Sequence, residues 1–74
     1  MFIKSKVSGT IVNLEHVYSI YMYYHEYESR FAIEVDCEFG NSVVIDEYAT
    51  EEQCKTALAE IYDKLEKLGK TITL

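Results

Sequence analysis

The strongest constraint on the fold is a change in the spacing of apolar residues along the chain. Near the C-terminus they recur at intervals of four and three, the period of one helix face: Cys54, Leu58, Ile61, Leu65 and Leu68. Upstream they recur at intervals of two, the period of a half-buried strand: Phe31, Ile33, Val35, Cys37 and Phe39. The chain therefore needs a sheet, and a helix that buries its apolar stripe on that sheet.

Both ends of the helix carry capping signals. Thr50 followed by Gln53 has the pattern of a capping box, and acidic residues 51 and 52 suit the positive end of the helix dipole. Lysines crowd the other end, and Gly69 is a natural C-cap. These signals predict a helix over residues 50–68.

Residues 1–48 are expected to form the sheet, with residues 2–7 and 10–13 as a first hairpin turning at Ser8-Gly9. A second hairpin turns at Tyr27-Glu28, because that turn pairs Tyr24 with Phe31 and lets the inward-facing residues of both strands match. In this register Tyr18 and Tyr24 face the core.

A third hairpin connection follows the alternating strand. A three-residue loop, residues 40–42, places Val43 and Ile45 inward, opposite Phe39 and Cys37. A two-residue loop would place both on the acidic face. The hydrophobic pattern favours the longer loop.

The predicted fold class is α+β. One domain, residues 1–74, holds a single antiparallel sheet of about five strands packed by one C-terminal amphipathic helix. Residues 71–74 could add a last, short edge strand. A core in a chain of 74 residues supplies only about 3–5 kcal/mol, so we also expect a homodimer.

Charge and composition exclude several classes of protein. The formal net charge is −6, and residues 14–48 hold eight of the thirteen acidic residues against one cation, Arg30. No basic stripe exists to bind a nucleic-acid backbone directly, and no apolar run is long enough to span a membrane or serve as a signal peptide. We expect a cytoplasmic protein whose thiols, on Cys37 and Cys54, are reduced and inward-facing.

No enzyme motif is present. The three glycines fall at turns or a cap, and there is no phosphate-binding loop, nucleophile elbow or zinc-protease motif. His16 and His25 lie near opposite ends of one strand, so they and the two cysteines cannot easily converge on a metal. We expect a non-enzymatic protein with no cofactor and no metal.

The tyrosines are the most informative feature. Five of seven fall between positions 18 and 27, and the predicted register turns two of them outward beside the carboxylates of the next strand. Tyrosine is enriched at interfaces, although its strand propensity alone also places it on exposed sheets. The predicted partner-binding face consists of Tyr21, Tyr23, Glu34, Asp36, Glu38 and Asp46, with Tyr48 beside it.

The order of these elements carries a resemblance. The segment from Gly9 to Ile20, GTIVNLEHVYSI, leads into the alternating hairpin, and Glu47 to Glu52, EYATEE, leads into the closing helix. In this the chain resembles small, mostly uncharacterised sheet-plus-helix proteins of Gram-positive bacteria and their phages. The resemblance implies a phage or mobile-element context, in which small acidic proteins often inhibit host defence or nucleic-acid enzymes.

The function predicted from these features is a protein-binding module that blocks a basic host protein through its acidic, tyrosine-rich sheet face. One alternative is a self-assembling homo-oligomer that makes a site between subunits. Another is a nucleotide sponge in which tyrosine rings stack on a base, although Arg30, Lys4 and Lys6 are the only cations outside the helix and its tail.

Overall fold

The computed structural model describes residues 1–69, leaving aside the side chain of Phe39. Its elements run in the order β1 (Phe2–Lys4), β2 (Ile11–Asn13), the 3-10 helix η1 (Leu14–His16), β3 (Val17–His25), β4 (Arg30–Cys37), the 3-10 helix η2 (Glu38–Gly40), β5 (Ser42–Tyr48) and α1 (Glu51–Lys67). The expected α+β class and closing helix are confirmed. The strand predicted at residues 71–74 lies outside the described residues.

The prediction of one five-stranded sheet is wrong. β1 and β2 form a two-stranded antiparallel sheet, and β3, β4 and β5 form a three-stranded one with β4 in the centre. The first hairpin does not turn at Ser8-Gly9, because β1 ends at Lys4 and residues 5–10 form a longer loop before β2. η1 then turns the chain between β2 and β3, so their ladders stay separate.

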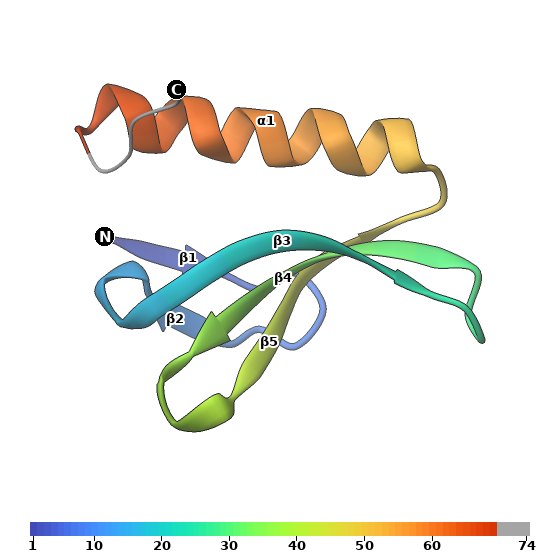
Figure 1. Ribbon diagram of the computed structural model, residues 1–74, viewed down its shortest axis with the longest axis horizontal. Coiled ribbons are helices and arrows are strands. Elements are labelled where there is room, and N and C mark those ends of the chain that lie inside the picture. Colours follow the sequence, from blue (N-terminus) through green and yellow to red (C-terminus); the bar gives the residue numbers. More distant parts are fainter. Residues whose placement is uncertain (70–74) are drawn as a thin grey trace.

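The helix lies across one face of the three-stranded sheet (Figure 1). The Thr50 hydroxyl accepts a hydrogen bond from the Gln53 amide at 3.2 Å, and Gly69 has a φ of +70°, so both predicted caps form. The core cluster between α1 and the strands contains Val12, Ile33, Val35 and Ile45 from the strands and Cys54 from α1, with Leu58 and Ile61 packed against it. No helix within residues 1–69 is long and apolar enough to cross a membrane.

The predicted β3–β4 register is confirmed, since Tyr24 pairs with Phe31, Met22 with Ile33 and Ile20 with Val35. The prediction that Tyr18 and Tyr24 face the core is wrong. A bulge between Val17 and Ser19 leaves Tyr18 unpaired and 75% exposed, and Tyr24, although paired with Phe31, is 46% exposed and outside the core cluster. The extra residue resets the alternation, so Val17 packs on the core instead of Tyr18.

The predicted β4–β5 register is wrong. η2 and Asn41 form the connection, and the Cys37 amide donates to the Asn41 carbonyl at 2.7 Å. Val43 consequently pairs with Val35, four residues earlier than the predicted partner, Phe39. A second bulge leaves Ile45 without a partner, since the pair of Ile33 is Asp46 and the pair of Glu34 is Val44.

Ser5 connects the N-terminal loop to this second bulge. It is fully buried, and its hydroxyl donates to the Val44 carbonyl while accepting from the Val7 and Ser8 amides. The Lys6 amide donates to the Ile45 carbonyl at 2.8 Å. The two carbonyls at the bulge are therefore satisfied by the loop, which holds the two sheets together.

Candidate functional site

The face of the three-stranded sheet away from α1 gathers most of the residues that the sequence singled out. Residues paired across two strands have their side chains on the same face, and alternate pairs share it. We call this surface the outer face; the observed register gives it Ser19, Tyr21, Tyr23, His25, Arg30, Ala32, Glu34, Asp36, Ser42, Val44 and Glu47. Among the described residues, no element contacts the outer face as extensively as α1 contacts the opposite face of the sheet.

Asp36 is the centre of a hydroxyl cluster. Its carboxylate accepts hydrogen bonds from the hydroxyl groups of Ser42 at 2.8 Å, Tyr21 at 2.9 Å and Ser19 at 3.0 Å. These bonds, the Ser42 bond most of all, favour the charged form and lower the pKa of Asp36 below its ordinary value. The same contact with Asp36 raises the pKa of Tyr21, whose ionised form would lose its donor. Asp36 is therefore a fixed anion on the outer face.

Glu34 is held by a neighbouring histidine. His25 Nε2 lies 3.3 Å from Glu34 Oε1, and the Glu34 side chain is only 12% exposed. The His25 ring in turn meets the Tyr23 ring edge-on, with 4.8 Å between the centroids. The contacts tie Tyr23, His25 and Glu34 into one row along the outer face.

Four of the six predicted partner-binding residues share this face: Tyr21, Tyr23, Glu34 and Asp36. Glu38 does not extend the strand as predicted. It lies in η2, where its carboxylate is 3.0 Å from His16 Nδ1. Asp46 is on the opposite face, because the Ile45 bulge pairs it with the inward-facing Ile33. The predicted position of Asp46 on the outer face is therefore wrong.

Among the outer-face residues that the predicted partner-binding face lacked are His25, Ser42 and Glu47. His25 could have been found, since it continues the odd-numbered outward series of Tyr21 and Tyr23. Ser42 and Glu47 could not, because their positions depend on where the η2 turn and the bulge fall. Ser42 proves important, as it makes the shortest hydrogen bond to Asp36.

Asp46 instead belongs to a polar cluster beside the helix. Its carboxylate accepts a hydrogen bond from the Tyr48 hydroxyl at 3.0 Å and lies 3.6 Å from Lys6 Nζ. Burial, followed by the bond to Asp46, raises the pKa of Tyr48 from 10.0 to about 12. Burial and Asp46 also raise the pKa of the nearby Cys54 thiol. Both groups are therefore kept protonated in the folded protein.

The native state should consequently lose stability in alkaline solution. The unfolded chain releases the Tyr48 proton near pH 10 and the folded chain only near pH 12, so deprotonation favours unfolding across this interval. Cys54, whose pKa is also raised, begins the decline from about pH 9, its ordinary value. We expect urea midpoints to fall between pH 8 and pH 11. A Tyr48→Phe variant should lose less over the same range, and an equal loss in the variant would contradict this assignment.

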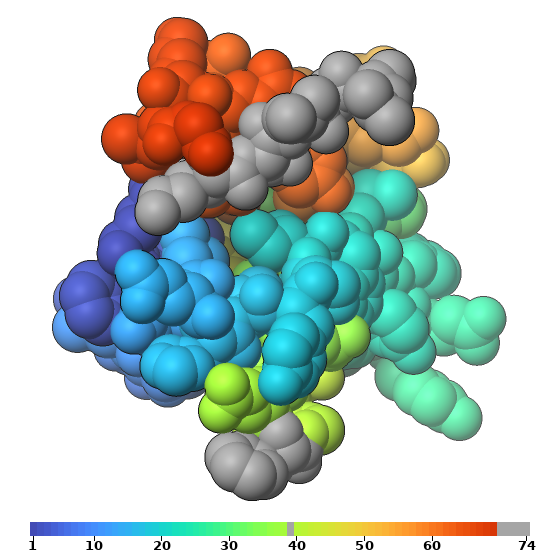
Figure 2. Space-filling model, turned by 60° about the vertical axis from the view of Figure 1, so that its left-hand side comes forward, coloured from blue at the N-terminus to red at the C-terminus, as the bar shows by residue number. Residues whose placement is uncertain are grey.

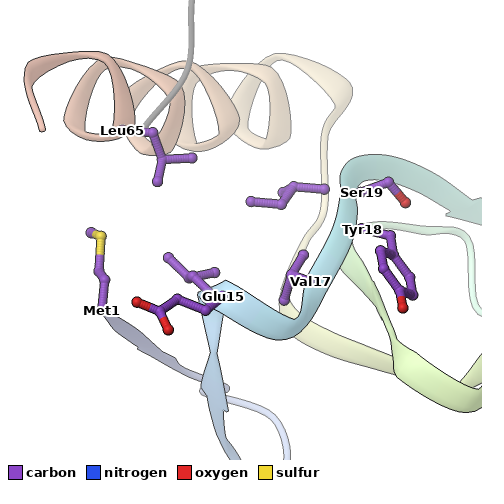
Figure 3. A pocket seen from close by; sticks show the side chains of 8 residues that line it. Met1, Glu15, Val17, Tyr18, Ser19 and Leu65 are labelled. Carbon is purple, nitrogen blue, oxygen red and sulfur yellow. The ribbon is translucent and has the colours of Figure 1, made fainter. Parts of the chain in front are cut away.

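A pocket of about 280 Å³ lies between η1, the start of β3 and the last turns of α1 (Figure 3). Met1, Leu14 and Leu65 line it with apolar groups, and Glu15 is the one carboxylate among its lining residues. Tyr18, displaced by the first bulge, also lines it. The pocket offers apolar contact and a single acid, with no hydrogen-bonded acid–base pair among its lining residues.

No three histidine, cysteine or acidic side chains within residues 1–69 are placed to hold a metal ion. Cys37 and Cys54 are both free thiols, with Cys54 buried in the core. Comparisons with family models, with curated proteins and with solved structures find no match to this chain. The site has to be interpreted from its own chemistry.

Proposed function

We propose that this protein is a non-enzymatic binding module that takes a basic partner protein on the outer face. The observation that carries the proposal is the hydroxyl-bonded carboxylate of Asp36, set among tyrosines on the sheet face that α1 leaves uncovered. A lowered pKa keeps this group charged at any physiological pH. A fixed carboxylate of this kind suits a charge-assisted hydrogen bond to arginine or lysine.

The surrounding side chains support the same partner. Glu34 and Glu47 add acidic groups, and Arg30 is the one cation of the outer face. Tyr23 is 50% exposed and packs on His25, which gives it a fixed orientation and a large free surface. Rigid aromatic groups beside charges are the composition of interface hot spots. Blocking a host protein in a phage or mobile-element setting extends this proposal and rests on the resemblance of the sequence.

Charge reversal should test the proposal once a partner has been captured from a host lysate. Glu34 and Asp36 are unsuitable for reversal, since their carboxylates make structural bonds. Glu47→Lys, at an outer-face carboxylate, should instead slow association several-fold at low salt, and the difference should shrink as salt rises. Surface plasmon resonance at two salt concentrations measures both effects.

A tyrosine variant and a matched control complete this experiment. Tyr23→Ala should act mainly on the dissociation rate, because aromatic anchors bind after the electrostatic encounter. Glu66→Lys makes the same charge change on α1, on the other side of the sheet, and should leave association close to that of the parent. If the control slows association as much as Glu47→Lys, net charge governs binding and the outer face is not the site.

A further inference from the structure

A hollow of about 320 Å³ lies at the β3–β4 hairpin, where the chain leaves the outer face. It is lined by six consecutive residues: Tyr23, Tyr24, His25, Glu26, Tyr27 and Glu28. The hairpin projects beyond the body of the molecule at the right of Figure 1 and again in the turned view of Figure 2. The hollow is therefore accessible to a partner protein that binds the outer face.

Two of the three tyrosines of the hollow are held in place by other rings. Tyr23 meets the His25 ring edge-on, and Tyr24 packs on Phe31 with 4.7 Å between the ring centroids. The Ser29 amide donates to the Glu26 carbonyl at 3.3 Å, and Ser29 has a φ of +51°, so a tight turn sets the position of Tyr27. Tyr27 is fully exposed. The Tyr27 ring is therefore accessible to a ligand at the hollow.

The charges of the hollow select its ligand. Glu26 and Glu28 are exposed carboxylates, and none of the six lining residues is a lysine or an arginine. Arg30, the nearest cation along the chain, pairs with His25 across the hairpin but does not line the hollow. Tyrosine faces carry negative electrostatic potential, and carboxylates beside them strengthen their attraction for a cation while repelling anions.

We propose that this hollow binds the guanidinium group of an arginine side chain on the basic partner. Guanidinium is planar, stacks on tyrosine and donates to carboxylates, whereas ammonium groups stack poorly and are more strongly hydrated. The inference rests on the proposed function for the source of the cation. Binding at the hollow itself requires only a guanidinium group, whatever molecule carries it.

A titration with a small probe tests the hollow without any partner. N-acetylarginine amide, added to the isotopically labelled full-length protein, should shift the backbone amide signals of residues 23–28 at millimolar concentration. N-acetylcitrulline amide has nearly the same shape but no charge. It should bind at least fivefold more weakly, and equal binding by the two probes would overturn the proposal.

Variants assign the effect to the aromatic group. Tyr27→Ala should weaken the arginine probe about two- to fivefold, while Tyr27→Phe keeps the ring and should bind like the parent. Tyr18→Ala removes another exposed tyrosine, which lies outside the hollow, and serves as the control. If Tyr27→Ala binds like the parent, or the arginine probe shifts no signal within residues 23–28, the hollow does not take guanidinium. Neither result bears on the charge-reversal experiment at Glu47, so the two proposals fail separately.

Discussion

Replacing Ile33 by alanine is expected to remove about 2–5 kcal/mol from the free energy of unfolding. Ile33 has no exposed surface, lies in the central strand and belongs to the core cluster beneath α1. The substitution removes apolar contacts and leaves a cavity that a three-stranded sheet can close only in part. Because a core of this size supplies only about 3–5 kcal/mol, the variant should be largely unfolded at low to moderate urea concentrations. Urea titration followed by circular dichroism measures the loss.

Two further substitutions calibrate this result. Ile33→Val removes one methylene group and should cost about 0.5–1.5 kcal/mol. Ile11→Ala makes the larger change at a side chain that is 64% exposed, and should cost less than about 0.5 kcal/mol. If the alanine variants at the two positions melt alike, the core does not lie where the helix covers β4.

The second large effect is expected at Ser5. Ser5→Ala removes one donor and one acceptor, which leaves the Val44 carbonyl and two loop amides without their partner. A buried polar group left unsatisfied costs about 1–3 kcal/mol, so the loss should be large for the removal of one oxygen atom. Hydrogen exchange should accelerate at residues 5–10, because the contact of this loop with β5 depends on the hydroxyl. Unfolding in urea gives the total cost.

Ser8→Ala is the matched control for this variant. The Ser8 hydroxyl makes exposed hydrogen bonds within the same loop, to Thr10, and its loss should change stability by less than about 0.5 kcal/mol. A Ser5→Ala variant as stable as Ser8→Ala would show that water replaces the Ser5 hydroxyl, and that Lys6 joins the loop to β5 through its backbone bond to Ile45 and its ion pair with Asp46.

The outer face was partly predictable from the sequence. Strand alternation from Tyr21 to Tyr23 and from Glu34 to Asp36 is a local property, so a correct hairpin turn brings all four together. Asp46 was assigned to the wrong face because strict alternation assigns every second residue to the same face. The bulge at Ile45 inserts one extra residue, which the alternating pattern of the sequence does not reveal. The Ser42 bond to Asp36 was missed for a related reason, since it depends on the length of the η2 turn.

Local signals alone determined the helix and the central hairpin. The capping pattern at Thr50 and Gly69 and the apolar stripe between them involve residues within a few turns of one another, and α1 follows them within one residue at each end. The β3–β4 register follows in the same way from two matched alternations joined by a short turn.

Only the tertiary structure decided the division into two sheets and the bulge at Ile45. The loop of residues 5–10 places the Ser5 hydroxyl and the Lys6 amide against the carbonyls of Val44 and Ile45, which lie some forty residues further along the chain. The hydrogen-bonding groups at that edge of β5 therefore find their partners in a loop instead of in a continuous ladder. Such a pairing joins segments distant in sequence, and no local periodicity records it.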